Sequence, residues 1–264
     1  MTKTQKERAF LRDLYINDEW TRRFTDLVDK HVDLKKAENL LYINSGTGNH
    51  AFALNEKIGK KAAIFGLSDD EHLLAISKDK AAAVKADVDF SMIRFEDEAF
   101  DIVLADASFV KPPDVEGFIH EAVRVARTDG KVAFFLASAG SFGEIFSLLW
   151  EMLFSEELGE NGAEIEAMVA AIPTVSRLEE IAANAGLVNI EAHSATEIFE
   201  FENGAEFIGS PLVADFLLPE WLKTLSEKEK GQAFKKLAQL IDVEDGNLTF
   251  RFSVKATLVT GEKS

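Results

Sequence analysis

The sequence predicts an α/β protein with a parallel sheet and helices on both faces. Apolar runs of strand length recur in the first half of the chain, at 39–43, 62–65, 100–104 and 131–137. Amphipathic stretches of helical length, 69–84 and 115–126, separate them. Strands and helices that alternate in this way form parallel sheets, because a crossover must carry the chain back to the same edge of the sheet.

Length and charge limit the classes of function. A chain of 264 residues with 47% hydrophobic residues is long enough to bury one large core, and it fits one elaborated domain. Its 46 acidic and 29 basic residues give a net charge of −17, which repels nucleic-acid phosphates and anionic lipid surfaces. We therefore expect a small-molecule ligand and no nucleic acid.

Residue types also argue against metal and membrane sites. The chain has no cysteine, and its five histidines show no ligand spacing, so we expect no metal site. No apolar run reaches the roughly 18 residues that a membrane-spanning helix needs. We therefore expect a cytoplasmic protein without a membrane span.

The remaining segments predict four parts. Residues 1–36 form an N-terminal helical cap whose Tyr15 and Trp20 either close over a ligand or pack in the core. Residues 37–195 form the α/β core, 196–246 a helical insertion, and 247–264 the final strand.

The stretch LLYINSGTGNHAFAL, residues 40–54, is the most informative motif. An apolar strand ends in a turn of Ser45, Gly46, Thr47, Gly48 and Asn49, and an amphipathic helix follows. Glycines let the backbone approach a ligand closely, and the helix directs its positive end toward it. The motif is typical of a nucleotide-type cofactor site.

Five segments in order resemble the class I S-adenosylmethionine-dependent methyltransferases of the small-molecule type, similar to methyltransferase type 11. They are INSGTGN, IFGLSDDEHLLAISK, VDFSMIRFEDEAFDIVLAD, EGFIHEAVRVARTDGKVAFFLAS and VSRLEEIAANAGLVNIEAHS. The resemblance implies a Rossmann-like, doubly wound sheet of seven strands with an antiparallel last strand. It also implies that S-adenosylmethionine lies across the carboxyl ends of the strands, at Asn44, Ser45, Gly46, Thr47, Gly48, Gly66, Leu67, Asp89, Phe90 and Asp106.

The chain departs from the resembled family at three places. Tyr42 stands where an acidic residue is usual, Asn44 replaces the first glycine, and Gly66 or Leu67 occupies the position of the acid that binds both ribose hydroxyls. Asp69 and Asp70 offer carboxylates nearby, either for the ribose or for capping the following helix.

These departures leave two functions open. In the favoured one, the chain methylates a small apolar or extended acceptor, with Asp106 as the candidate beside the transferred methyl group. In the alternative, it is a catalytically silent binding or scaffold subunit that uses the apolar residues 205–222 as a homodimer or partner surface. A nicotinamide-dependent oxidoreductase fits less well, because the turn lacks the third glycine.

Overall fold

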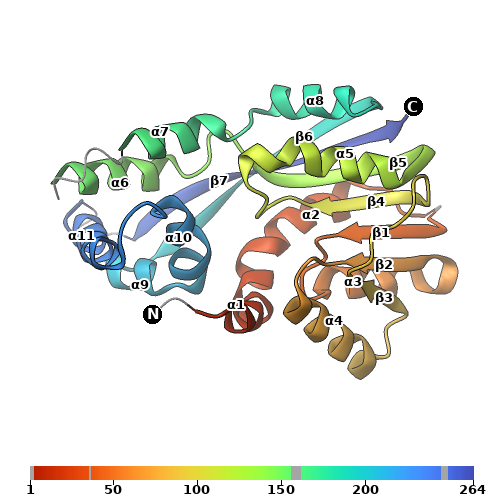
Figure 1. The fold of residues 1–264 in the computed structure, drawn as a ribbon, viewed down its shortest axis with the longest axis horizontal. Coiled ribbons are helices and arrows are strands. Elements are labelled where there is room, and N and C mark those ends of the chain that lie inside the picture. Colours follow the sequence, from red (N-terminus) through yellow and green to blue (C-terminus); the bar gives the residue numbers. More distant parts are fainter. Residues whose placement is uncertain (1–2, 36, 156–161, 245–248) are drawn as a thin grey trace. The chain divides into compact units, whose positions relative to one another are not determined.

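The computed structural model describes residues 3–35, 37–155, 162–244 and 249–264. Seven strands form one sheet in the order β3-β2-β1-β4-β5-β7-β6. Strand β7 is antiparallel, which Figure 1 shows by its reversed arrow. The predicted fold class is thus confirmed. The strands are β1 (Asn39–Ile43), β2 (Ala63–Leu67), β3 (Val88–Ser91), β4 (Phe100–Asp106), β5 (Ala126–Ser138), β6 (Leu187–Phe201) and β7 (Phe250–Lys263).

The chain divides into two compact units. The larger unit, which we call the α/β unit, comprises Lys3–Leu136, Thr174–Ala195 and Ala256–Ser264. The smaller unit, which we call the helical unit, contains Ala137–Pro173 and Thr196–Lys255. This division differs from the expected one, because residues 137–173 group with the insertion and not with the α/β core.

The helices of the α/β unit include three that follow one another without a break near the N-terminus. Thr4 begins the first of them with a capping box, in which its hydroxyl accepts from the Glu7 amide and the Glu7 carboxylate accepts from the Thr4 amide. The helices are α1 (Gln5–Leu11), the π-helix η1 (Arg12–Thr21), α2 (Arg22–His31), α3 (Asn49–Ile58), η2 (Gly59–Lys61), α4 (Glu71–Val84), η3 (Pro112–Asp114), α5 (Val115–Val125) and α8 (Val175–Asn184).

Side chains of β1 alternate between two apolar layers. Leu41 and Ile43 pack in a cluster with Ile119 of α5 and Leu178 of α8. The intervening Tyr42 points to the other layer, where its hydroxyl meets His50 of α3. The apolar run of β1 is therefore buried on both faces, as a central parallel strand requires.

The carboxyl ends of the parallel strands meet at one edge of the α/β unit. Strand β1 pairs in parallel with β2 and β4, so the residues that follow Ile43, Leu67 and Asp106 lie close together. Figure 1 shows α1 and α2 beside this edge. The N-terminal segment is thus positioned where the turn after β1 begins.

The helical unit buries most of its apolar residues within itself. Phe207 is fully buried against Phe201 and Phe250, and the Trp221 ring lies 5.1 Å from Phe142 and 5.2 Å from Phe146. Its helices are α6 (Gly143–Ser155), α7 (Gly162–Ala171), α9 (Gly204–Gly209), η5 (Leu212–Leu217), α10 (Leu218–Trp221) and α11 (Glu227–Glu244).

Two expectations for the insertion need correction. Strand β6 continues to Phe201, so residues 196–201 extend the sheet instead of opening a helical segment. The expected partner surface at 205–222 has most of its large apolar side chains in the interior, including Leu212, Val213 and Leu218. Within the same unit, Phe207 of this segment packs against Phe201 of β6 and Phe250 of β7.

The structure describes no helix that is long and apolar enough to cross a bilayer. Within the same described ranges, no cluster of three histidine, aspartate or glutamate side chains is arranged to hold a metal ion.

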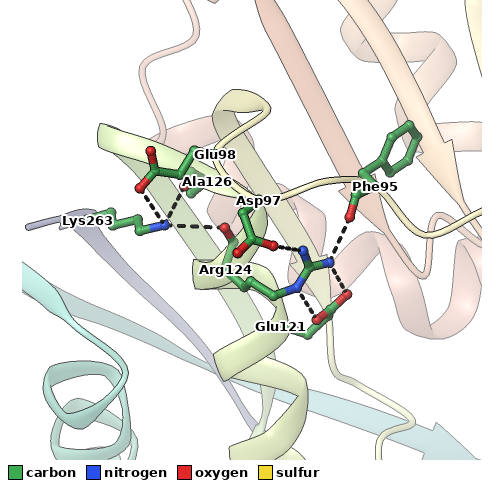
Figure 2. A network of polar contacts seen from close by, with 7 residues as sticks. All are labelled: Phe95, Asp97, Glu98, Glu121, Arg124, Ala126 and Lys263. Atoms are coloured by element: carbon green, nitrogen blue, oxygen red, sulfur yellow. Dashed lines mark hydrogen bonds and ion pairs between the residues drawn. The ribbon is translucent and has the colours of Figure 1, made fainter.

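A polar network holds the loop before β4 onto α5 (Figure 2). Arg124 donates two hydrogen bonds to the Glu121 carboxylate, at 2.8 and 2.7 Å, and one of 2.9 Å to the Phe95 carbonyl, and it pairs with Asp97. These carboxylates, Glu121 first, raise the pKa of the Arg124 guanidinium. Lys263 of β7 donates to the Arg124 and Ala126 carbonyls at the end of the same helix.

We predict that Arg124→Met lowers the free energy of unfolding by about 1–2 kcal/mol, because the Phe95 carbonyl and two carboxylates lose a charged donor while Arg124 is about one third exposed. Chemical denaturation measures this change. Arg177→Met is the matched control, since Arg177 also joins two carboxylates but on an exposed surface. Equal losses in the two variants would contradict a special role for the Arg124 network.

Candidate functional site

The turn after β1 has a backbone conformation that lets a ligand approach it closely. Asn44, Gly46 and Gly48 all adopt left-handed conformations, with φ of 56°, 59° and 87°. Asparagine tolerates this region better than other residues with a side chain, so Asn44 can replace the usual glycine at low cost. The turn is closed by the Gly48 amide, which donates to the Ser45 carbonyl at 3.0 Å.

The two glycines of the turn face different surroundings. A Cβ on Gly48 would lie 2.7 Å from the Phe90 ring and 2.8 Å from the Phe52 ring, so packing alone requires glycine there. A Cβ on Gly46 would have only the Asn17 side-chain oxygen near it, at 4.0 Å. Gly46 therefore leaves open space, which belongs to two cavities.

The cavities have volumes of about 420 Å³ and about 320 Å³, and Arg12, Gly46 and Asp106 line both. The larger, which we call the first cavity, lies at the carboxyl ends of β1, β2 and β4, and its other lining residues include Asn44, Ser68, Asp69, Leu73, Phe109 and Phe118. The smaller, the second cavity, lies among η1, α2 and α3, and its other lining residues include Asn17, Asp29, Tyr42, Ser45 and His50.

Asp106 ends β4 as a buried carboxylate, with only 3% of its surface exposed. Its Oδ1 accepts the Ser108 amide at 2.8 Å, and its carbonyl accepts the Asn44 side chain at 3.1 Å. Burial raises the pKa of Asp106, while the positive charge of Arg12 opposes the increase. The structure thus brings Asp106 together with Asn44 and Gly46, as the sequence positions suggested.

The two acids after β2 have separate roles. The Asp70 carboxylate caps α4 by accepting the His72 amide at 2.8 Å and the Leu73 amide at 3.0 Å. Asp69 makes no such cap and lines the first cavity. Of the two carboxylates that the sequence left open for the ribose, Asp69 is the one at the cavity.

Gly66 and Leu67 line neither of these two cavities. A Cβ on Gly66 would lie 2.3 Å from Cδ1 of Phe90 and 2.8 Å from the Ser45 hydroxyl. Gly66 is therefore covered by the Phe90 ring, and the sequence could not reveal this contact between neighbouring strands.

Asp89 and Phe90 are likewise absent from the linings of the two cavities. Asp89 lies within β3 with its side chain exposed, whereas Phe90 is buried and packs edge-on against Phe52 at 5.5 Å. Alternation along the strand places the two side chains on opposite faces of the sheet. The described geometry does not bring Asp89 to the turn.

Two polar residues of η1, which sequence reasoning missed, contact the turn from the N-terminal segment. The Thr47 hydroxyl donates to the Asp13 carboxylate at 2.7 Å and accepts from the Asn17 amide at 2.7 Å. Lys80 of α4 donates to Asp13. Arg12 directly precedes Asp13 in the chain. The spacing of Asp13 and Asn17, one helical turn apart, was the available signal, and π-helices are frequent at functional sites.

Tyr15 and Trp20, the aromatic residues that the sequence suggested for covering a ligand or packing in the core, have different surroundings. Trp20 is 1% exposed and packs against Phe24 and Phe109, with ring centroids 5.0 and 5.5 Å away. Tyr15 is exposed. Trp20 is therefore a core residue of the α/β unit.

The second cavity contains a chain of polar contacts that ends at Tyr42. Nδ1 of His50 lies 3.2 Å from the Tyr42 hydroxyl, and Nε2 lies 3.6 Å from the Asp29 carboxylate. Contacts with His50 and Lys57 lower the pKa of Asp29 to about 2, so this carboxylate is ionised at neutral pH. Burial raises the pKa of Tyr42, which keeps its proton.

One hydroxyl in the second cavity has no partner. Ser45 is 8% exposed, and its Oγ makes no hydrogen bond within the described part of the chain. A buried polar atom without a partner costs about 1–3 kcal/mol, so a ligand that hydrogen-bonds there gains affinity. The cavities thus combine open space beside the Gly46 backbone with several carboxylates, the Arg12 guanidinium and the Ser45 hydroxyl, which has no partner in the described part of the chain.

Sequence comparison identifies relatives of this chain. Residues 41–134 match the family described as a methyltransferase domain. The demethylmenaquinone methyltransferase of Shouchella clausii is 24% identical over 184 residues, which are 63% of this chain and 77% of that protein. The demethylmenaquinone methyltransferase of Lactococcus lactis is 25% identical over 218 residues, which are 72% and 86% of the two chains.

Solved structures share the fold at lower identity. The YcgJ protein from Bacillus subtilis has a TM-score of 0.57 at 14% identity, covering 92% of this chain and 98% of its own. Phosphoethanolamine N-methyltransferase 2 of Haemonchus contortus, in complex with S-adenosyl-L-methionine, has a TM-score of 0.52 at 17% identity and covers 93% and 53%. Likeness at this level establishes the architecture.

Proposed function

We propose that this chain, which matches a methyltransferase domain over residues 41–134, is a class I S-adenosylmethionine-dependent methyltransferase and that it methylates a small apolar acceptor from a donor bound at the Ser45–Asn49 turn. The observation that carries this proposal is the pair of cavities that meet at Gly46, Arg12 and Asp106. They open at the carboxyl ends of β1, β2 and β4, where ligands of open α/β sheets bind.

The residues at the two cavities fit the donor's functional groups. Asp69 offers a carboxylate to the ribose hydroxyls, in place of the acid that is missing at Gly66 and Leu67. Gly46 leaves space for close approach of the ligand, and the Ser45 hydroxyl is free to bond it. In this proposal Asn44, Thr47 and Gly48 shape the turn and Asp106 faces the reacting end.

The donor supplies an electrophilic methyl group on a positively charged sulfur, which is transferred to the acceptor as the acceptor loses a proton. The protein contributes chiefly by holding the two reactants in line. The buried Asp106 carboxyl group is positioned by the Ser108 amide and lines both cavities together with Gly46 of the turn, and its burial raises its pKa. Tyr42 and His50 line the second cavity and contact each other there.

The proposed acceptor is an apolar aromatic molecule of the demethylmenaquinone type. The supporting observation is that the relatives named demethylmenaquinone methyltransferase from Shouchella clausii and Lactococcus lactis align with this chain over most of their length.

Calorimetry with S-adenosylhomocysteine, followed by transfer of a labelled methyl group, tests this function. We expect one molecule to bind per chain, and the label to pass to reduced demethylmenaquinone with a shortened side chain but not to phosphoethanolamine. Label on the polar acceptor alone would refute the proposed acceptor class. Absence of S-adenosylhomocysteine binding would refute the enzyme function and favour the silent scaffold.

A further inference from the structure

Arg12 occupies the junction of the two cavities. It begins the π-helix η1 and lines both cavities together with Gly46 and Asp106. Two other cationic residues, Lys111 and Arg22, line one cavity each. A ligand that spans both cavities therefore lies close to Arg12 in each of them.

The Arg12 guanidinium has unused hydrogen-bonding capacity. It lies 4.8 Å from the centre of the Phe109 ring, a cation–π contact that uses none of its five N–H donors in a directed hydrogen bond. Within the described part of the chain it makes no hydrogen bond or ion pair. Burial lowers the pKa of Arg12, and the charges of Asp106 and Asp69 oppose this effect.

The neighbours of Arg12 hold it in place. Asp13 and Asn17 bond the Thr47 hydroxyl, and Lys80 joins Asp13 to α4, so η1 is attached to the glycine turn next to Arg12. These contacts hold the backbone next to Arg12, and the Phe109 ring contacts the guanidinium itself. A guanidinium at this place can bind a planar anion through two parallel N–H donors.

We propose that Arg12 binds the α-carboxylate of the donor's methionine moiety and thereby makes the N-terminal segment part of the donor site. This inference rests on the proposed function. The carboxylate is the only anionic group of S-adenosylmethionine, and most of the other charged residues that line the cavities are aspartates, which repel it. Arg12 then selects donors that carry a carboxylate.

Calorimetry with two ligands tests this role. S-adenosylhomocysteine carries the carboxylate, whereas its decarboxylated analogue keeps the adenosine, the sulfur and the amine. We expect wild-type protein to prefer S-adenosylhomocysteine by about tenfold to a hundredfold, the range for a charge-assisted bidentate pair. In Arg12→Met we expect this preference to disappear, with affinity for the decarboxylated analogue within about twofold to threefold of wild type. Arg12→Lys should retain an intermediate preference, because a single ammonium cannot form two parallel bonds.

Arg8→Met is the matched control. It removes one positive charge four residues earlier, on α1, from a residue that lines neither cavity, and the ligand preference should stay as in wild type. Equal affinity of wild-type protein for the two ligands, or an undiminished preference in Arg12→Met, would overturn the role of Arg12 and leave the proposed function standing. Failure of wild type to bind either ligand would overturn both. The wild-type comparison decides the question even if Arg12→Met does not fold.

Discussion

Gly46→Val should weaken S-adenosylhomocysteine binding by at least about a hundredfold. The new side chain extends into the space that the two cavities share, where a Cβ meets nothing closer than Asn17 at 4.0 Å. Because this space is open in the protein itself, the valine is accommodated and the ligand is excluded. Because Gly46 has φ of 59°, the variant also loses about 1–3 kcal/mol of folding stability. Calorimetry measures the first effect and chemical denaturation the second.

Gly59→Val separates the loss of binding from backbone strain. Gly59 also has a positive φ, of 68°, with no atom within 4 Å of the position that a Cβ would occupy, and it lines neither cavity. The variant should lose stability and keep its affinity for S-adenosylhomocysteine. Wild-type affinity in Gly46→Val would place the ligand away from the turn.

Gly66→Asp should lower the free energy of unfolding by about 2–4 kcal/mol and bring no gain in affinity for S-adenosylhomocysteine. The sequence alone suggests the opposite, since an acid at this position restores the ribose ligand of the resembled family. The Phe90 ring excludes it, because a Cβ would lie 2.3 Å from Cδ1 of a residue that is 3% exposed. Overpacking of this kind costs about 1–3 kcal/mol, and a buried carboxylate adds to the cost.

A double-mutant cycle tests the stated cause. Gly66→Ala introduces the same Cβ without charge, and Phe90→Leu removes the ring that it meets. The loss from Gly66→Ala should be smaller in the Phe90→Leu background than in wild type, because the two positions are in contact. Additive losses would mean that another neighbour makes glycine necessary, and tighter ligand binding by Gly66→Asp would contradict the geometry directly.

The order of strands and helices could be predicted because each signal is local. Apolar runs define β1 and β4 within a few residues, and the turn at Gly46 and Gly48 follows directly from residue types that tolerate left-handed conformations. The cap of α4 is equally local, since Asp70 bonds amides two and three residues away. The resemblance to a known family then implied the seven-stranded sheet.

Only the tertiary structure decided which side chains reach the turn. Asp13 and Asn17 contact Thr47 across 34 and 30 residues of sequence, and Gly66 lies beneath Phe90 of the next strand. No periodicity or spacing rule reports such contacts, because they depend on how distant elements pack. The sequence by itself therefore determined the fold and the position of the glycine turn, whereas the packing of η1 and β3 determined that Arg12 and Asp69 stand at the cavities and that Gly66 does not.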